Sequence, residues 1–183
     1  MQLLNGKNAI ITGAASARGL GKATAQMMSD HGARIAILDL DQSAAAAAAA
    51  DIGADHIGLA CDVTDQAVCA AAVKTVTEKL GPIDILVNNA GITQPLKFMD
   101  IAPDNYDAVL DVNLRGTLYM SQAVIPAMRA RKSGAIVNIS SVSAQRGGGI
   151  FGGPHYSAAK AGILGLTKAM ARELSPDGVR ANA

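Results

Sequence analysis

Residues 8–21 read NAIITGAASARGLG and join the signals of a strand, a loop of small residues and the start of a helix. The short, mainly apolar run 8–11 ends in Thr12-Gly13, which predicts a buried strand, and a helix is expected over about 22–31. Backbone N–H groups at such a helix start attract an anion, and glycines allow a pyrophosphate to approach the backbone. The glycine spacing departs from G-x-G-x-x-G, so a plain turn between strand and helix stays open as an alternative.

The next predicted strand, 33–38, ends in an acidic residue, Asp39. Asp39 lies eighteen residues beyond Gly21, where a dinucleotide fold places the acceptor of the ribose hydroxyls. A carboxylate there would repel a 2′-phosphate, so Asp39 indicates NAD rather than NADP, although Arg18 in the loop could attract that phosphate. The alternative is that Asp39 or Asp41 caps a helix formed by the alanine run 44–50.

Strands and helices alternate along the whole chain, without repeats or an internal linker. This order predicts one doubly wound α/β domain over residues 1–183, with helices on both faces of a parallel sheet and therefore three layers. In such a sheet a ligand lies at the carboxyl ends of the strands. The later strands are expected at 56–61, 83–87, 135–139 and 179–183, and the helices between them at 66–80, at 104–130 and from Tyr156 onward.

Polar or small residues follow several strands at that edge. Asp62 could meet an adenine edge, and the run Asn88-Asn89-Ala90-Gly91 suits close approach by a flat ligand. Ser140-Ser141 ends the fifth strand. Asn113 lies in the middle of helix 104–130, and because an amide is a poor helix former we expect it to have a specific role.

Tyr156 and Lys160 lie four residues apart in the segment PHYSAAKAG, so a helix places them on one face, about one turn apart. A nearby ammonium stabilises a phenolate, which would let the pair act as acid and base near neutral pH. The alternative is that Tyr156 packs in the core and Lys160 reaches solvent. The polar residues that follow the strands earlier in the sequence favour the catalytic interpretation.

The composition limits the classes of function. The chain has 183 residues, half of them hydrophobic, and a net charge of +1 from dispersed charges, so nucleic-acid binding is not expected. Cys61 and Cys69 lack metal-ligand spacing and no histidine lies near enough to complete a site, so no metal is expected. Without a run of eighteen apolar residues or a signal-peptide pattern, we expect a cytoplasmic protein with no membrane span.

Taken together in this order, these residues resemble the short-chain dehydrogenase/reductase family, over essentially the whole chain, and imply a Rossmann-like fold. The marks are Thr12-Gly13 with Gly19 and Gly21, Asp62, Asn88-Asn89-Ala90-Gly91, Asn113, Ser141, and Tyr156 with Lys160.

The resemblance implies that Tyr156 is the general acid/base and that Lys160 assists it and holds the nicotinamide ribose. It also implies that Ser141 hydrogen-bonds the substrate oxygen and that Asn113 holds a water of the proton relay. The implied contacts to the dinucleotide are Gly13, Ser16, Arg18, Gly19, Leu20, Asp39, Asp62, Val63, Asn89, Ala90 and Gly91, together with Tyr156 and Lys160.

The implied activity is hydride transfer between NAD, with NADP as the second choice, and a secondary alcohol or its ketone, in the style of 3-oxoacyl-[acyl-carrier-protein] reductases. A sugar or polyol dehydrogenase on the same scaffold is one alternative. A dinucleotide-binding sensor or subunit without turnover is another, but a pure binder needs no proton relay. The resemblance also implies that helix 104–130 and the Tyr156 helix pair across a twofold axis into a homodimer or homotetramer.

Three features depart from the family pattern. Five residues instead of three separate Gly13 from Gly19, so Ser16 and Arg18 are expected to bulge toward the adenosine phosphate or the solvent. The loop before Tyr156 is two residues longer than usual. Counting back from Tyr156 by the usual interval reaches Ser143, whereas the strand end gives Ser141, which we prefer because a sheet fixes its strand ends while a loop absorbs length.

The longer loop, with Gln145, Arg146, Phe151 and His155, is expected to shape the substrate pocket. The third departure is that the sequence stops after the sixth strand, before the Pro-Gly turn, helical lid and seventh strand of the family. The sheet is then expected to end in an exposed edge. We expect the 183-residue chain alone to show little or no turnover.

Overall fold

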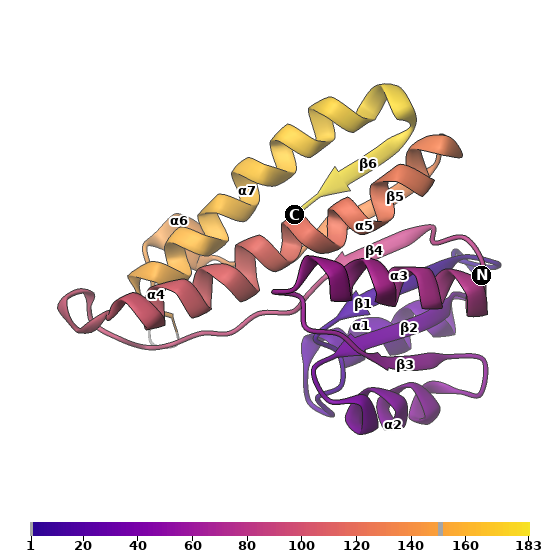
Figure 1. The fold of residues 1–183 in the computed structure, drawn as a ribbon, viewed down its shortest axis with the longest axis horizontal. Helices are drawn as coiled ribbons and strands as arrows, with labels where there is room; N and C mark the ends of the chain where they lie inside the picture. Colours follow the sequence, from indigo (N-terminus) through magenta and orange to yellow (C-terminus); the bar gives the residue numbers. More distant parts are fainter. Residues whose placement is uncertain (1, 150–151) are drawn as a thin grey trace.

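The computed structural model describes residues 2–149 and 152–183, which form a six-stranded parallel sheet with helices on both faces (Figure 1). The strand order β3-β2-β1-β4-β5-β6 confirms the predicted doubly wound α/β fold, and no seventh strand occurs among the described residues. The strands are β1 Asn8–Thr12, β2 Arg34–Asp39, β3 Ile57–Ala60, β4 Ile85–Asn88, β5 Gly134–Asn138 and β6 Val179–Asn182. The main helices are α1 Leu20–Asp30, α2 Gln42–Ile52, α3 Gln66–Leu80, α4 Pro103–Leu110, α5 Gly116–Ala130 and α7 Pro154–Leu174.

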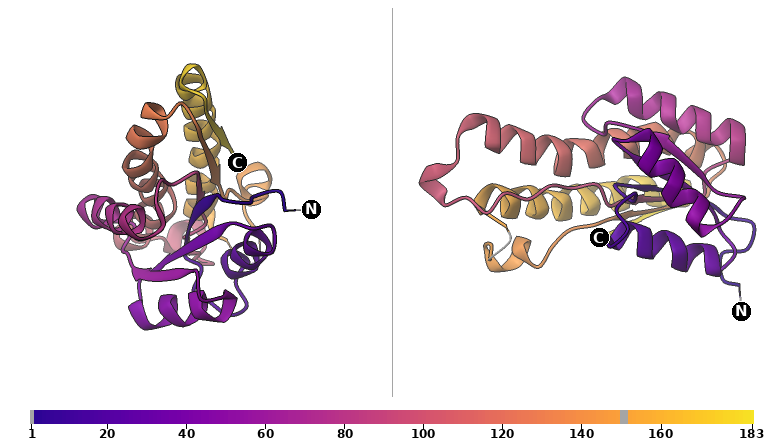
Figure 2. Two further views of the ribbon diagram at one scale, coloured as in Figure 1. Left: turned by 90° about the vertical axis from the view of Figure 1, so that its right-hand side faces the viewer. Right: turned by 90° about the horizontal axis from the view of Figure 1, so that it is seen from below.

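The two faces of the sheet have separate hydrophobic cores because successive side chains of a strand point to opposite faces. Ile10 of β1 packs with apolar residues of α3, α5 and α7, whereas its neighbour Ile11 packs with α1 and α2. Figure 2 shows α1 and α3 on opposite sides of the sheet. Val137 of β5 points to the α1 and α2 face but is only partly buried, so that outer layer is less complete over β4 to β6.

The strand order reverses between β1 and β4, both of which pair in parallel with their neighbours. In a doubly wound sheet this reversal opens a crevice at the carboxyl ends of the two strands, where a ligand can bind. The segments that follow β1 and β4 therefore define the place to look for a site.

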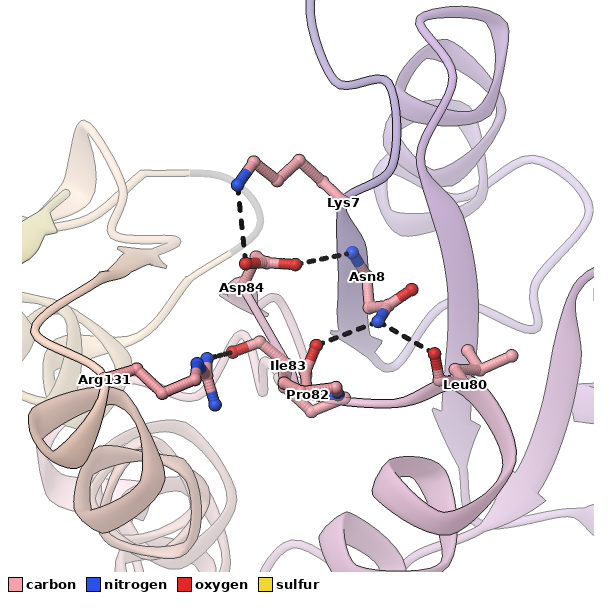
Figure 3. A network of polar contacts seen from close by, with 7 residues as sticks. All are labelled: Lys7, Asn8, Leu80, Pro82, Ile83, Asp84 and Arg131. Atoms are coloured by element: carbon pink, nitrogen blue, oxygen red, sulfur yellow. Dashed lines mark hydrogen bonds and ion pairs between the residues drawn. The ribbon is translucent and has the colours of Figure 1, made fainter.

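The opposite, amino-terminal edge of the sheet is closed by polar contacts (Figure 3). Asn8 donates its side-chain amide to the carbonyl oxygens of Leu80 and Pro82, both at 2.9 Å, which holds the turn after α3 against β1. The Asp84 carboxylate accepts the Asn8 backbone N–H at 3.0 Å and lies 3.5 Å from Lys7 Nζ. Arg131 donates to the Ile83 carbonyl at 2.7 Å. These contacts satisfy backbone groups where α3, β1 and β4 meet.

Several predicted elements differ in detail. The helix expected over 104–130 is divided into α4, a π-helical turn Asp111–Arg115 and α5. The expected loop 144–154 begins with a four-residue helix, α6 Ser143–Arg146, and the connection before α4 contains a 3₁₀ turn, Phe98–Asp100. The Tyr156 helix ends in a second 3₁₀ turn, Ser175–Asp177. Turn-length helices have no apolar period to reveal them, which is why the sequence pattern did not indicate them.

The alanine run forms α2 as predicted, and the capping alternative is correct for Asp41 alone. Asp41 Oδ1 accepts the backbone N–H groups of Ser43 and Ala44, at 2.7 and 2.9 Å. This capping also lowers the pKa of the Asp41 carboxyl, chiefly through its hydrogen bond with the Ser43 side chain. Asp39 takes no part in this cap and lines the crevice instead.

Candidate active site

A glycine cradle lies where β1 and β4 end. Gly13 has a positive φ of 63°, and a Cβ built on it would lie 2.6 Å from Ala90 Cα, so only glycine fits there. Asn89 joins the two strand ends by donating its side-chain amide to the carbonyl oxygens of Thr12 and Gly13, at 2.9 and 2.8 Å. Thr12 Oγ1 in turn accepts the Ala90 N–H at 3.0 Å. These contacts bring the loop after β1 into close contact with the loop after β4.

Asp39 ties the end of β2 to the same cradle. Its Oδ2 accepts the backbone N–H of Ala15 at 2.9 Å, and its Oδ1 accepts the N–H of Leu40 at 2.8 Å. The half-buried carboxylate therefore fixes the start of the loop between β1 and α1, called the phosphate loop below, while it remains on the wall of the crevice.

The crevice is a cleft of about 450 Å³. Most of the residues expected to contact a dinucleotide line it, whereas Ser16 and Arg18 are exposed on the outer side of the phosphate loop and are not among its lining residues. Asp62 lies on its wall and its Oδ1 accepts the Thr64 N–H at 2.9 Å. The lining residues are Gly13, Gly19, Leu20, Leu38, Asp39, Leu40, Cys61, Asp62, Val63, Asn89, Ala90, Gly91, Ile92 and Val112.

A second hollow, of about 390 Å³, holds Tyr156 and Ser141. The Tyr156 ring packs so closely on Gly152 that a Cβ at Gly152 would lie 2.5 Å from the ring. Ser141 Oγ accepts the backbone N–H of Ser143 at 3.1 Å, which leaves its own hydrogen available to another acceptor. Ser143 lines the same hollow, so both serines considered from the sequence lie near Tyr156.

Lys160 is buried behind this hollow, with 4% of its surface exposed. Its Nζ donates to the Ile139 carbonyl at 2.7 Å and lies 5.7 Å from the centre of the Tyr156 ring. Ser140 Oγ donates to the Lys160 carbonyl at 2.8 Å, so α7 is fixed in register with the end of β5. Burial lowers the pKa of Lys160 to about 8, because the ammonium loses its hydration.

Asn113 lies in the π-helical turn and is fully buried. Its amide nitrogen donates to the carbonyl oxygens of Val109 and Ile92, both at 2.8 Å. Its Oδ1 accepts no hydrogen bond from the described residues. A Cβ at Gly91 would lie 2.6 Å from that oxygen and 3.4 Å from Lys160 Nζ, so both polar atoms border Gly91.

The site geometry can be compared with that of known proteins. A family model described as short chain dehydrogenase matches residues 7–183. The chain belongs to the short-chain dehydrogenase family.

Relatives of the chain include members with and without an assigned substrate. An uncharacterized short-chain type dehydrogenase/reductase, y4mP, of Sinorhizobium fredii is 57% identical over 185 residues, which cover 98% of this chain and 73% of the relative. The sorbitol dehydrogenase of Cereibacter sphaeroides is 41% identical over 181 residues, covering 98% of this chain and 69% of the relative. The crystal structure of a Brucella melitensis 3-ketoacyl-(acyl-carrier-protein) reductase complexed with NADH superposes with a TM-score of 0.91 at 35% identity, covering 97% of this chain and 73% of that chain.

These findings identify an oxidoreductase family and an NAD-binding Rossmann fold, as the sequence resemblance implied. Within this short-chain dehydrogenase, five lining residues of the cleft were not named as contacts from the sequence: Leu38, Leu40, Cys61, Ile92 and Val112. Leu40 and Ile92 directly follow named residues at strand ends, which was the available signal. Val112 belongs to a helix far along the chain, and only the tertiary fold brings it to the cleft.

The long loop before Tyr156 contributes unevenly to the second hollow. Arg146 lines it, whereas Gln145 is exposed and is not a lining residue. His155 is buried, with its Nε2 3.3 Å from Gln94 Oε1, and burial lowers its pKa. Phe151 lies outside the described residues.

Two further searches covered the described part of the chain. No group of three His, Cys, Asp or Glu side chains lies close enough together to hold a metal ion. None of the helices is both long enough and apolar enough to span a bilayer.

Proposed function

We propose that this short-chain dehydrogenase is an NAD(P)-dependent oxidoreductase that interconverts a secondary alcohol and a ketone, in the style of 3-oxoacyl thioester reductases. The observation that carries the proposal is that Tyr156 and Ser141 share one hollow while Lys160 Nζ lies 5.7 Å behind the Tyr156 ring. An acid/base, a donor to the substrate oxygen and a cation are thereby held together by the end of β5 and the start of α7.

The neighbouring cleft fits a dinucleotide. Gly13 and Gly91 line it, and a Cβ at either position would clash with Ala90 or Asn113, so the backbone stays bare where a flat ligand can lie against it. Lys160 would hold the nicotinamide ribose. When bound, the nicotinamide supplies or accepts the hydride.

The side chains of this chain would handle the proton. Ser141 donates a hydrogen bond to the substrate oxygen, and the Tyr156 hydroxyl gives a proton to that oxygen during reduction or removes it during oxidation. Lys160 Nζ lies 5.7 Å from the centre of the Tyr156 ring and places a positive charge behind this acid/base. Asn113 is held by the Val109 and Ile92 carbonyls, so its free Oδ1 can accept a hydrogen bond from a water molecule. This water would belong to the relay that returns a proton to Tyr156.

The Tyr156→Phe variant tests this assignment. It removes the hydroxyl but keeps the ring that packs on Gly152, so the melting temperature and NADH affinity should hardly change. Turnover of the full-length protein on a panel of ketones should fall about 10²- to 10⁴-fold, the usual contribution of a positioned acid/base. Turnover close to that of the unmodified protein would refute the role of Tyr156.

NAD is the proposed cofactor because Asp39 lies on the wall of the cleft with its carboxylate near the phosphate loop. That carboxylate would accept the ribose hydroxyls and repel a 2′-phosphate. Arg18 is exposed outside the cleft, so it offers less attraction to NADP than its sequence position suggested. Fluorescence titration should show tighter binding of NADH than of NADPH, and the reverse ranking would overturn the role of Asp39.

A sugar or polyol dehydrogenase is the second candidate, favoured by the similarity to a sorbitol dehydrogenase. Comparing oxidation of sorbitol with reduction of a 3-oxoacyl thioester separates the two. The noncatalytic sensor is less well supported because a binder does not need Tyr156, Lys160, Ser141 and Asn113 together.

We also propose that the chain forms a homodimer or homotetramer through α4, α5 and α7. A groove of about 560 Å³ runs between these helices, and Leu114, Leu118, Gly165 and Leu166 are among its lining residues. A second copy related by a twofold axis would cover it with the same residues. Sedimentation that shows only monomer for the full-length protein would contradict this assembly.

A further inference from the structure

The hollow that contains Tyr156 has an unbalanced charge. The described residues that line it include one arginine and no carboxylate: Thr93, Ser141, Val142, Ser143, Arg146, Gly148, Gly149, Gly152 and Tyr156. An adjoining hollow of about 280 Å³ shares Gly148, Gly149 and Gly152 with it and adds Lys97, again without a carboxylate among its described lining residues. The two hollows therefore present positive charge to whatever occupies them.

Arg146 has no ionic partner within the described chain. Arg129, by comparison, is paired with Asp177 and Glu173, and Arg115 lies 3.2 Å from Asp111. No described side chain or carbonyl accepts a hydrogen bond from the Arg146 guanidinium. A guanidinium carries two parallel N–H donors that match a carboxylate or phosphate, so an unpaired one on the wall of a hollow is suited to bind such a group.

The local fold places Arg146 on the wall of the hollow that holds Tyr156. Arg146 is the last residue of α6, and Ser143 is the first, so the two are three positions apart and lie on one face of the helix. Both residues line the hollow together with Ser141 and Tyr156, and Arg146 is exposed there. Gly147, in the left-handed conformation with φ 78°, ends the helix immediately after Arg146.

We propose that the substrate carries an anionic oxygen group, a carboxylate or a phosphate, that Arg146 binds in the same hollow in which Tyr156 and Ser141 meet the reacting oxygen. This rests on the proposed oxidoreductase function and specifies its substrate class. A short 3-hydroxy or 3-oxo acid fits, because its carboxylate and its reacting oxygen can occupy one hollow of about 390 Å³. In a thioester of coenzyme A the phosphates lie a pantetheine arm away from the reacting carbon, so such a substrate would not bring a phosphate into the same hollow. Neutral polyols lack the group that Arg146 recognises.

The test compares three substrates that share one reacting carbon: 3-hydroxybutyrate, its methyl ester and its coenzyme A thioester. The kcat and KM values for oxidation by NAD are measured for the full-length protein, Arg146→Gln, Arg146→Lys and the control Arg172→Gln. Arg172 is exposed in the last turn of α7, at the opposite end of that helix from Tyr156.

Arg146→Gln should raise KM for the anionic substrate about 10- to 100-fold, the range expected for a hydrogen bond to a charged group. kcat and the values for the methyl ester should change less than about twofold. Arg146→Lys should restore part of the affinity because it keeps the charge but loses the planar fork. Arg172→Gln should behave like the unmodified protein. An effect confined to the free acid identifies the anion as the substrate's carboxylate. An effect confined to the thioester would mean that Arg146 meets a phosphate of coenzyme A outside the hollow, and would refute the proposal.

A binding measurement separates this proposal from the proposed reaction. Butyrate has the carboxylate but no reacting oxygen, and calorimetric titration into the NADH complex reports its affinity without turnover. If no substrate is oxidised but butyrate binding is lost in Arg146→Gln, the reaction is wrong and the anion site stands. Suppose instead that the unmodified protein oxidises the methyl ester as efficiently as both anionic substrates, and that Arg146→Gln changes kcat and KM for none of the three. The proposed reaction then stands and the anion site is refuted. An equal loss for all three substrates would also refute it.

Discussion

The two edges of the sheet use polar residues in opposite ways. At the amino-terminal edge, Asn8, Asp84 and Arg131 bind backbone groups of neighbouring elements, although Asn8 Oδ1 is itself buried without a partner among the described residues (Figure 3). At the carboxyl-terminal edge, glycines let the loops after β1 and β4 pack in close contact beside an open cleft, Asn113 Oδ1 has no partner among the described residues, and Lys160 is buried with a lowered pKa. The first arrangement stabilises the junction of α3, β1 and β4, and the second leaves binding capacity for a ligand.

Adding a methyl group at Gly91, on the carboxyl-terminal edge of the sheet (the ligand edge), should have the largest effect on activity. In Gly91→Ala the new Cβ would lie 2.6 Å from Asn113 Oδ1, an atom that cannot move easily because the same side chain donates two hydrogen bonds. Displacement of this order commonly costs about 100-fold, and we expect that loss in kcat/KM together with weaker NADH binding.

The matched control is Gly165→Ala, at a helical position where a Cβ meets nothing within 4 Å. Gly165 also lines the groove of the proposed subunit interface, so sedimentation first establishes that Gly165→Ala keeps the oligomeric state of the unmodified protein. Its NADH affinity should then be unchanged. Equal NADH affinity in Gly91→Ala and the unmodified protein would mean that the edge at Gly91 is not part of the cofactor site.

Lys160 should make the ligand edge sensitive to pH. Its pKa is lowered from 10.5 to about 8 by burial, so below about pH 8 the buried charge opposes folding in full. Between about pH 8 and 10.5 the folded chain has released this proton and the unfolded chain still holds it, so the destabilisation disappears as pH rises. Relative to Lys160→Met, the unmodified protein should gain about 2 kcal/mol of unfolding free energy between pH 7 and 10.

Urea unfolding at the two pH values measures that gain without a cofactor. Lys168→Met, which removes an exposed lysine of the same helix, should show no such pH-dependent difference. A stability difference for Lys160→Met that is the same at both pH values would contradict the depressed pKa.

The amino-terminal edge should give the smallest change, and in stability alone. Asn8→Ala removes the donor to the Pro82 carbonyl and one of the two donors to the Leu80 carbonyl, which keeps its hydrogen bond from Arg34. This loss should lower the unfolding free energy by about 1–2 kcal/mol. NADH affinity should stay within about twofold, because Asn8 lies at the end of β1 away from the cleft. A parallel loss of NADH affinity would show that the two edges do not act independently.

The strand ends were predictable because hydrophobic runs followed by polar residues are a local pattern. Asp39, Asp62, Asn89 and Ser141 each follow such a run, and the parallel order places them at one edge. The tie between Asp39 and the Ala15 N–H could not be predicted, because it depends on how the phosphate loop folds back. The π-helical turn at Asn113 was also hidden, since α4, the turn and α5 form one continuous apolar pattern. Only packing shows which of Ser141 and Ser143 is positioned by backbone contacts, and both remain beside Tyr156.

The π-helical turn at residues 111–115 changes the rotational register between helices α4 and α5. An additional residue in a helix rotates everything after it by about 100°, so α4 and α5 face different neighbours although their axes are nearly continuous. Met120 and Val124 of α5 thereby reach the core under the sheet, while Asn113 turns toward Ile92. Deleting one residue there would preserve the helical content, and a circular dichroism spectrum would hardly change. The deletion would nevertheless turn the core side chains of α5 away from the sheet, so the length of this turn, as well as its residues, is a requirement of the fold.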